Sequence, residues 1–267
     1  MVRKPFVQLF SVHAFVKKDE HLQQLPLAFV LMSRLRRVDY DSVLQALIGV
    51  LPRRPRVQAV VADFELAVWS AVKNALPGVT QRGCCFHFKQ AVWRNVQNVG
   101  LQVAYGSDDN VNRLCRKTMA LAFLPPAVIS RAFEDLEQEN VRPEVSAHLD
   151  YVRRNWIDSQ VWPPSTWSVF QQPIRTNNDV EGWHRRLNSK AGHSQLNLYQ
   201  LVQLLGQEAT LGAVGVRLMS EAGAARVQRK KYRKVNTFIF DRWAEYSAGT
   251  RSAASLLNAC SHAVKAL

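Results

Sequence analysis

The short apolar run Val57–Ala62 constrains the fold of this chain more than any other feature. Its nearly continuous apolar character is typical of a central strand that is buried on both faces. Asp63 follows at once, and the spacing of apolar residues over Phe64–Leu76 predicts a helix, which Pro77 and Gly78 end. A buried strand that leads directly into a helix favours an α/β fold.

Two further runs of strand length precede this unit. Phe6–Val16 and Leu25–Ser33 predict a hairpin, and the polar stretch Lys17–Gln24 between them predicts a long loop. A helix is expected over Asp39–Leu51, so that the hairpin feeds a parallel crossover. From Val92 onward helical spacing dominates, with helices expected over Leu114–Leu124, Ala127–Gln138, Glu144–Trp156, Asn178–Asn188 and Leu196–Val214.

The charge of the chain bears on its partners. Lys and Arg number 35 against 21 Asp and Glu, a net charge of +14 in 267 residues. Such an excess favours nucleic acid, because each phosphate that is neutralised releases counterions. A ribosomal or a membrane-surface protein is the alternative that charge leaves open. The four cysteines form no disulfide framework, no apolar signal segment opens the sequence, and no run approaches a membrane span, so we expect a soluble protein of a reducing compartment.

Two acidic residues occupy positions that suit metal chemistry. Asp63 ends the central strand, where ligand sites of open α/β sheets gather, although it could instead cap the following helix. Glu181 and His184 are spaced i, i+3 and would share one helix face. Asn178 and Glu181 also match a capping box, which leaves a structural role for Glu181 open.

Two further motifs are less specific. Cys84 and His87 form a Cys-x-x-His pair that could hold zinc with distant donors, or the cysteine could simply be buried beside an aromatic ring. The run Arg226–Lys234 is a solvated helix face, a nuclear targeting patch or an arm that contacts phosphates. The candidate DNA contacts in this run are Arg226, Arg229, Lys230, Lys231, Arg233 and Lys234.

Five segments, taken in order and spacing, resemble the Mutator-like element (MULE) transposase family over about residues 5–210. They are VVADFELAVWSAV (Val60–Val72), GCCFHFKQAVWRNV (Gly83–Val96), LAFLP (Leu121–Pro125), YVRRNWI (Tyr151–Ile157) and RTNNDVEGWHRRLN (Arg175–Asn188). The resemblance implies an RNase-H-like mixed sheet, here incomplete, with a mostly helical insertion and C-terminal helices. It also implies a DDE triad that binds Mg²⁺, with Asp63 as the second acid and Glu181 as the third. His184 would support this site, and Cys84 and His87 match the Cys-x-x-His motif of the family.

One departure from the family pattern shapes the functional expectation. The first acid of the triad should lie on a first strand in a D-G-T-F-like segment, which the sequence lacks, and Asp19 and Asp39 lie in the wrong elements to replace it. A zinc-finger-like DNA-reading module is also missing upstream. We therefore expect an N-terminally truncated, inactive descendant of a transposase. The alternatives are a host-adapted, non-catalytic DNA-binding protein that keeps the fold and a structured RNA-binding protein.

The expected organisation has four parts. They are a core over residues 1–105, a helical insertion over 106–172, core helices carrying the third acid over 173–215 and a basic tail over 216–267. The expected partner is DNA, with homo-oligomerisation left open and no membrane contact. The expected compartment is the nucleus.

Overall fold

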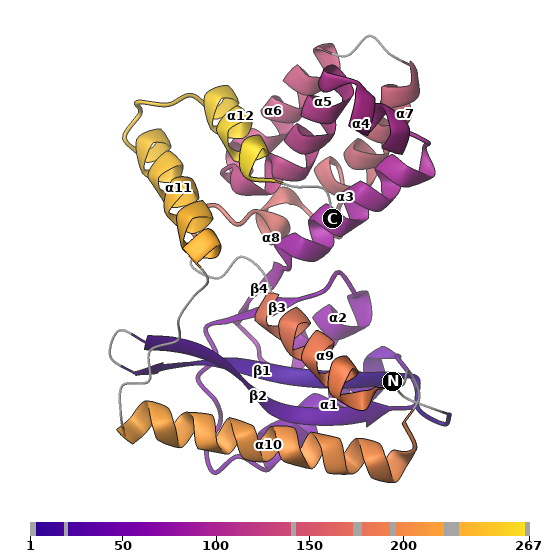
Figure 1. Cartoon of the computed structure of the whole chain (residues 1–267), viewed down its shortest axis with the longest axis vertical. Coiled ribbons are helices and arrows are strands. Elements are labelled where there is room, and N and C mark those ends of the chain that lie inside the picture. The colour runs from indigo at the N-terminus through magenta and orange to yellow at the C-terminus, as the bar shows by residue number, and fades with distance from the viewer. Residues whose placement is uncertain are drawn as a thin grey trace. The chain divides into compact units, whose positions relative to one another are not determined.

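The structure is a computed structural model that describes residues 4–18, 21–139, 143–172, 178–192, 196–221 and 230–264 (Figure 1). The chain divides into two compact units. Unit 1 comprises Met1–Val60, Glu65–Thr80 and Asn177–Gln228, and unit 2 comprises Val61–Phe64, Gln81–Thr176 and Arg229–Leu267. The chain is mixed α/β and mostly helical, so the predicted fold class is confirmed at this level.

A β-hairpin forms the sheet of unit 1. Strands β1 (Gln8–Lys18) and β2 (His21–Met32) pair antiparallel, with Leu9 opposite Leu31 and a register shift between Val12 and His13. The predicted hairpin is confirmed. The predicted long loop is wrong, because both strands continue through the polar stretch up to the pair Lys18 and His21. Ladder hydrogen bonds join backbone groups, so polar side chains do not end the pairing.

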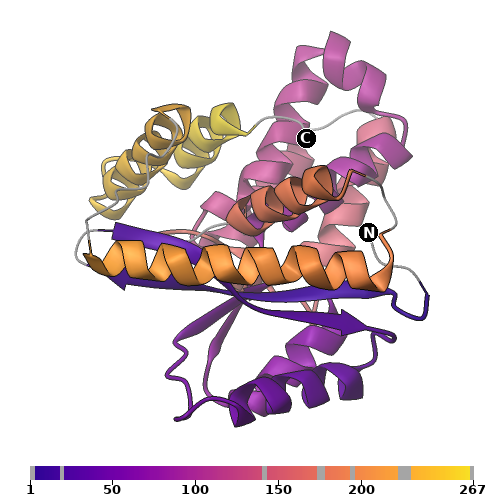
Figure 2. The same cartoon turned by 60° about the horizontal axis from the view of Figure 1, so that its bottom comes forward.

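Helices α9 (Asn178–Ala191) and α10 (Leu198–Glu221) cover one face of this hairpin, and α10 runs alongside it in both ribbon views (Figures 1 and 2). Both helices were expected, and α10 extends seven residues further than predicted. The apolar cluster between the hairpin and these helices contains Leu9, Phe29 and Leu31 from the strands and Trp183, Leu187, Ala191, Leu196, Leu201, Leu204 and Leu205 from the helical segment.

Helices α1 (Arg37–Gly49) and α2 (Leu66–Ala75) pack against each other in the same unit, close to the predicted ranges. Tyr40 on α1 is fully buried, and its ring meets that of Phe10 edge-on at 5.4 Å. Its hydroxyl lies 2.8 Å from Gln8 Oε1 and 2.9 Å from Glu65 Oε1. One buried hydroxyl thus ties α1 both to β1 and to the start of α2.

Strands β3 (Ala59–Ala62) and β4 (Thr80–Gly83) form a second, two-stranded sheet. Thr80 N donates to Gln58 O, and Cys84 N donates to Ala62 O, so both strands advance together and run parallel. The predicted strand is confirmed. The predicted crossover from the hairpin is not found among the described residues, because β3 pairs with β4 across α2 and the hairpin forms a separate sheet. Burial on both faces is wrong, because Ala59 is exposed and the other three residues are only partly buried. Among the described residues β3 pairs only with β4, which leaves it far less covered than a central strand.

Unit 2 is helical apart from the ends of these strands. Its elements are α3 (Cys85–Asn98), α4 (Gln102–Ser107), α5 (Asp109–Ala120), the 3₁₀ turn η1 (Leu121–Phe123), α6 (Pro126–Gln138), α7 (Pro143–Val152), the π turn η2 (Arg153–Ile157), α8 (Pro164–Trp167), α11 (Lys230–Ser247) and α12 (Ala253–Ala263). The segment expected to be a basic tail therefore contains two helices, whose residues Trp243, Leu256 and Leu257 belong to the core of this unit.

Aromatic rings fill the centre of unit 2. Phe88 is fully buried and stacks on Trp167 with 4.5 Å between ring centroids, and Trp156 meets Phe88 edge-on at 4.9 Å. His148 on α7 is also fully buried, with Asn95 Oδ1 2.8 Å from Nδ1 and Thr118 Oγ1 3.1 Å from Nε2. Burial lowers the pKa of His148 to about 4, so this core holds a neutral imidazole at physiological pH.

Candidate functional site

Asp63 lies directly after β3, at the carboxyl end of two parallel strands. Its side chain is 56% exposed, so its carboxylate is open to solvent and to ligands. Asp63 is not the N-cap residue of α2, because that position belongs to Glu65, which makes no side-chain capping bond. The position of Asp63 instead matches the edge at which parallel sheets bind ligands.

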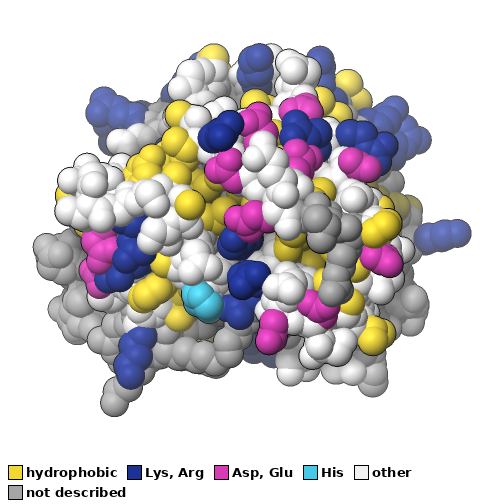
Figure 3. Space-filling view, turned by 90° about the horizontal axis from the view of Figure 1, so that it is seen from above, with side chains coloured by type: hydrophobic (Ala, Val, Ile, Leu, Met, Phe, Trp, Pro, Cys, Tyr) yellow, Lys and Arg dark blue, Asp and Glu magenta, His cyan; other side chains and the backbone are white. Residues whose placement is uncertain are grey.

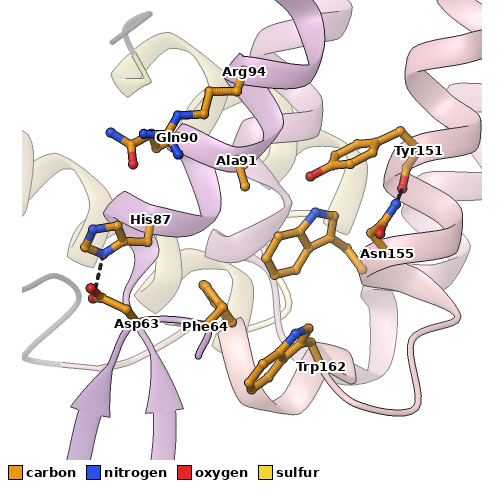
Figure 4. Close-up of a pocket in the computed structure, with 10 residues that line it drawn as sticks. Asp63, Phe64, His87, Gln90, Ala91, Arg94, Tyr151, Asn155 and Trp162 are labelled. Carbon is orange, nitrogen blue, oxygen red and sulfur yellow. Dashed lines mark hydrogen bonds and ion pairs between the residues drawn. The ribbon is translucent and has the colours of Figure 1, made fainter. Parts of the chain in front are cut away.

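His87 reaches Asp63 from the first turn of α3. Its Nδ1 lies 2.8 Å from Asp63 Oδ1, and Figure 4 shows the two side chains directed at each other. Burial alone would lower the pKa of His87, but its interactions with Asp63 and then Cys84 raise that pKa to about 10. The two side chains therefore form an imidazolium–carboxylate ion pair at neutral pH.

A glycine allows the chain to turn tightly at this point. A Cβ atom at Gly83 would overlap the ring of Phe64, which itself packs edge-on against Trp156 and Trp162. Only glycine therefore lets β4 approach the residue that follows Asp63. The ring of Phe64, the residue next to Asp63, therefore occupies the space that a side chain at position 83 would need.

A pocket of about 370 Å³ opens beside the ion pair, within unit 2 (Figure 4). Asp63 and His87 line one side, and aromatic and amide side chains line the rest. The remaining lining residues are Phe64, Gln90, Ala91, Arg94, Tyr151, Asn155, Trp156 and Trp162. The site thus combines a carboxylate, a cation and flat apolar walls.

Comparison with protein families identifies part of the chain. Residues 3–91, about a third of the 267-residue sequence, match the family model of the MULE transposase domain. Over this segment the chain is similar to MULE transposase domains. The resemblance inferred from the sequence is confirmed over this range, which contains Asp63, Cys84 and His87. No curated protein and no solved structure matches the chain.

The predicted third acid lies outside the matched MULE segment. Glu181 is on α9, three residues before His184, so the helix places both on one face as expected. The side chains of Glu181 and Asn178 lie outside the described residues, and so does any test of the capping box. Glu181 belongs to unit 1 and Asp63 to unit 2, and their convergence stays a prediction.

His184 joins a polar row that sequence reasoning missed. Its Nε2 lies 3.5 Å from Ser11 Oγ on β1, and Ser11 Oγ lies 3.0 Å from His13 Nε2. Burial, followed by the charge of His184, lowers the pKa of His13 to about 4. The signal was present in the sequence, because Ser11 and His13 are two residues apart within the apolar part of the strand and so share one face.

The proposed zinc pair, Cys84 and His87, lies at the start of α3. The two side chains interact directly through a hydrogen bond. In the part of the chain that the structure describes, no three His, Cys, Asp or Glu side chains form a group able to hold a metal ion. The zinc and magnesium assignments therefore stay predictions, in which Cys84 and His87, or Asp63, supply only some of the ligands.

The predicted DNA-contact run is described only at its end. Arg226 and Arg229 lie outside the described residues, whereas Lys230, Lys231 and Arg233 belong to α11 without described side chains and Lys234 is exposed. On the face in Figure 3, Lys and Arg are interspersed with Asp and Glu rather than gathered in one patch. Across the described residues, no helix is long and apolar enough to cross a membrane.

Proposed function

We propose that the chain binds DNA and that Asp63 and Glu181 supply two carboxylates of a site for DNA strand cleavage and transfer. The observation that carries this proposal is the position of Asp63, which is exposed at the carboxyl end of β3 inside the segment that is similar to MULE transposase domains. Carboxylates at that edge suit divalent cations. The position of Glu181 on a helix beside the hairpin of unit 1 is compatible with the same role.

The residues of the chain have separate tasks in this scheme. Mg²⁺ held by the carboxylates would activate a water or a 3′-hydroxyl and stabilise the leaving oxygen. His87 orients the carboxylate of Asp63 through their ion pair, and Gly83 leaves room for the ring of Phe64 next to Asp63. The net charge of +14 supplies the attraction for the phosphate backbone.

The test separates binding from chemistry. Affinity for a duplex oligonucleotide should fall steeply with salt concentration when measured by fluorescence anisotropy. Removal of residues 226–234 should make the affinity less dependent on salt. An unchanged dependence would mean that this run is a solvated helix face and does not contact DNA. Absence of any DNA binding at low salt would overturn the proposal as a whole.

Strand cleavage is tested with substitutions that remove charge and keep shape. Any Mn²⁺- or Mg²⁺-dependent nicking or strand transfer should be lost in Asp63→Asn and in Glu181→Gln. The matched control is Asp109→Asn, at an exposed acid in the first turn of α5. Cleavage that survives in both site variants would contradict the roles of Asp63 and Glu181.

A second function is favoured by the ion pair itself. Because His87 already neutralises Asp63, the chain could serve as a non-catalytic, host-adapted DNA-binding protein that keeps the transposase fold. Full DNA affinity together with no metal-dependent cleavage, in wild type and in both site variants, would support this alternative. Either function would place the protein in the nucleus.

The Cys-x-x-His pair is proposed as a zinc or structural pair. Zinc content of the purified chain should fall in Cys84→Ser and in His87→Ala. Cys115→Ser is the matched control, because Cys115 is equally buried in unit 2. Zinc-free wild-type protein would leave a packing role for Cys84.

A further inference from the structure

The pocket beside Asp63 is walled by aromatic rings that the cleavage chemistry does not use. Phe64 meets Trp156 edge-on at 4.8 Å and Trp162 edge-on at 5.3 Å, and Tyr151 lines the same pocket (Figure 4). Tyr151 and Trp162 are partly exposed, so their rings are accessible from the pocket. With a volume of about 370 Å³, the pocket is at the small end of ligand sites and suits a single flat ring system.

A π turn places two of the lining residues. Asp158 N donates to Arg153 O at 2.9 Å, five residues back, so η2 inserts one extra residue where α7 would otherwise continue. That insertion rotates every following side chain by about 100° relative to a regular helix. Asn155 and Trp156, which line the pocket, lie within this turn, and π turns occur frequently at functional sites.

Polar groups that line the pocket can form hydrogen bonds with the edge of a bound ring. Asn155 Nδ2 donates to Tyr151 O, its Oδ1 is an acceptor, and the amide of Gln90 can donate or accept. Trp156 is 4% exposed, and its Nε1 has no hydrogen-bond partner among the residues that the structure describes. Because this atom is shielded from solvent, it does not contact a ligand in the pocket, and the polar contacts come from Asn155 and Gln90.

We propose that this pocket takes up an unpaired base of DNA, lifted out of the helix stack, while Asp63 faces the adjoining backbone. Aromatic walls stack on any base, the two amides offer partners to its Watson–Crick edge, and the exposed Arg94 at the rim suits a phosphate. The inference rests on the proposed DNA-binding function. It adds that the chain prefers DNA with an unpaired base over fully paired DNA.

The test compares two duplexes that differ in one base. One is fully paired, and the other carries a single extrahelical 2-aminopurine, whose fluorescence falls when it stacks on an indole. We expect the full chain to bind the bulged duplex about tenfold more tightly than the paired one, since stacking of one base changes affinity by that order. Binding should also quench the 2-aminopurine.

Trp162→Ala and Asn155→Ala should each remove most of the tenfold preference and leave affinity for the paired duplex unchanged. Both side chains are at least partly exposed, so the fold should survive, which circular dichroism checks. Arg94→Ala should weaken the bulged complex more than Arg113→Ala, an exposed arginine of the same unit that does not line the pocket.

The outcomes separate this inference from the proposed function. Equal affinity for both duplexes in wild type, or a preference that survives in Trp162→Ala and Asn155→Ala, would overturn the base pocket and leave DNA binding intact. Binding of neither duplex would overturn both. Equal preference for a bulged RNA duplex would contradict the restriction to DNA.

Discussion

Different kinds of interaction stabilise the interior of each of the two units of this chain. Unit 1 has a small apolar cluster between a two-stranded hairpin and two helices, and it buries hydrogen-bonded polar groups at Tyr40 and Glu208. Unit 2 has an extended apolar core around stacked aromatic rings. A small sheet cannot bury enough apolar surface alone, so unit 1 depends more on precisely partnered polar groups.

Glu208 shows this dependence most clearly. It is 1% exposed on α10, and it accepts hydrogen bonds from Trp183 Nε1 at 2.7 Å, Arg186 at 3.0 Å and Lys190 at 2.7 Å. Burial alone would raise the pKa of Glu208, but the bonds from Lys190, Arg186 and Trp183 lower it. The ionised carboxylate of Glu208 therefore joins α10 to α9 through three hydrogen bonds.

The largest expected effect is on the core of unit 2. Phe88→Ala should lower the free energy of unfolding of that unit by about 3–5 kcal/mol, because it leaves a cavity beside Trp167. Phe238→Ala, at a ring 37% exposed on α11, should cost less than about 1 kcal/mol. Urea unfolding followed by tryptophan fluorescence measures both. Equal losses of unfolding free energy in the two variants would show that the aromatic core is not the main source of stability in unit 2.

Acid should weaken unit 2 through His148. Its pKa is about 4 in the folded chain and about 6.5 when unfolded, so the unfolded state binds the proton first as pH falls. The contribution of neutral His148 to the free energy of unfolding is complete above pH 6.5. It is lost progressively between pH 6.5 and pH 4, by about 3 kcal/mol in total. His148→Gln should flatten the dependence of unfolding free energy on pH over that range. A slope identical to wild type would remove His148 from this account.

The stability of unit 1 should depend on the hydrogen bonds that Glu208 accepts. Glu208→Ala removes the acceptor of the buried Trp183 N–H and should destabilise unit 1 by roughly 2 kcal/mol. The cost stays moderate because Arg186 and Lys190 are 55% and 38% exposed and can be hydrated. Hydrogen exchange should rise in α9 and α10 and not in α5. Unchanged exchange in α9 and α10 would contradict the contrast between the units.

The smallest expected effect concerns the turn at the site. Gly83→Ala should cost about 1–2 kcal/mol, because its methyl group must displace the ring of Phe64 between Trp156 and Trp162. Gly106→Ala, in the exposed helix α4 with no atom near the added Cβ, should be neutral or slightly stabilising. Thermal unfolding compares the two. A neutral Gly83→Ala would mean that the turn tolerates a wider approach.

Strongly periodic segments were predictable from the sequence, and short paired ones were not. The hairpin, α1, α2 and the helices α5, α6 and α7 of unit 2 follow from apolar spacing. Strand β4 was missed because Thr-Gln-Arg-Gly has little β signal, and its pairing with β3 creates the strand. The polar ends of β1 and β2 were assigned to a loop for the same reason, since ladder pairing is a non-local property.

The candidate site was predicted as single residues and not as an arrangement. Asp63, Cys84 and His87 were identified from the sequence, yet their spacing did not predict the ion pair between Asp63 and His87. Trp156 reaches the pocket through a π turn, and nothing in the sequence RRNWI distinguishes a π turn from a regular helix. Such contacts depend on which elements pack together, which local patterns do not encode.

The most direct test of the central claim is metal-directed backbone cleavage of the full chain bound to DNA. Fe²⁺ that occupies a Mg²⁺ site generates radicals which cut the peptide chain close to its ligands. The account predicts cuts near both Asp63 and Glu181, and loss of both sets of cuts in either Asp63→Asn or Glu181→Gln. Cuts near only one of these residues, or cuts that persist in both variants, would contradict a metal site shared by the two acids.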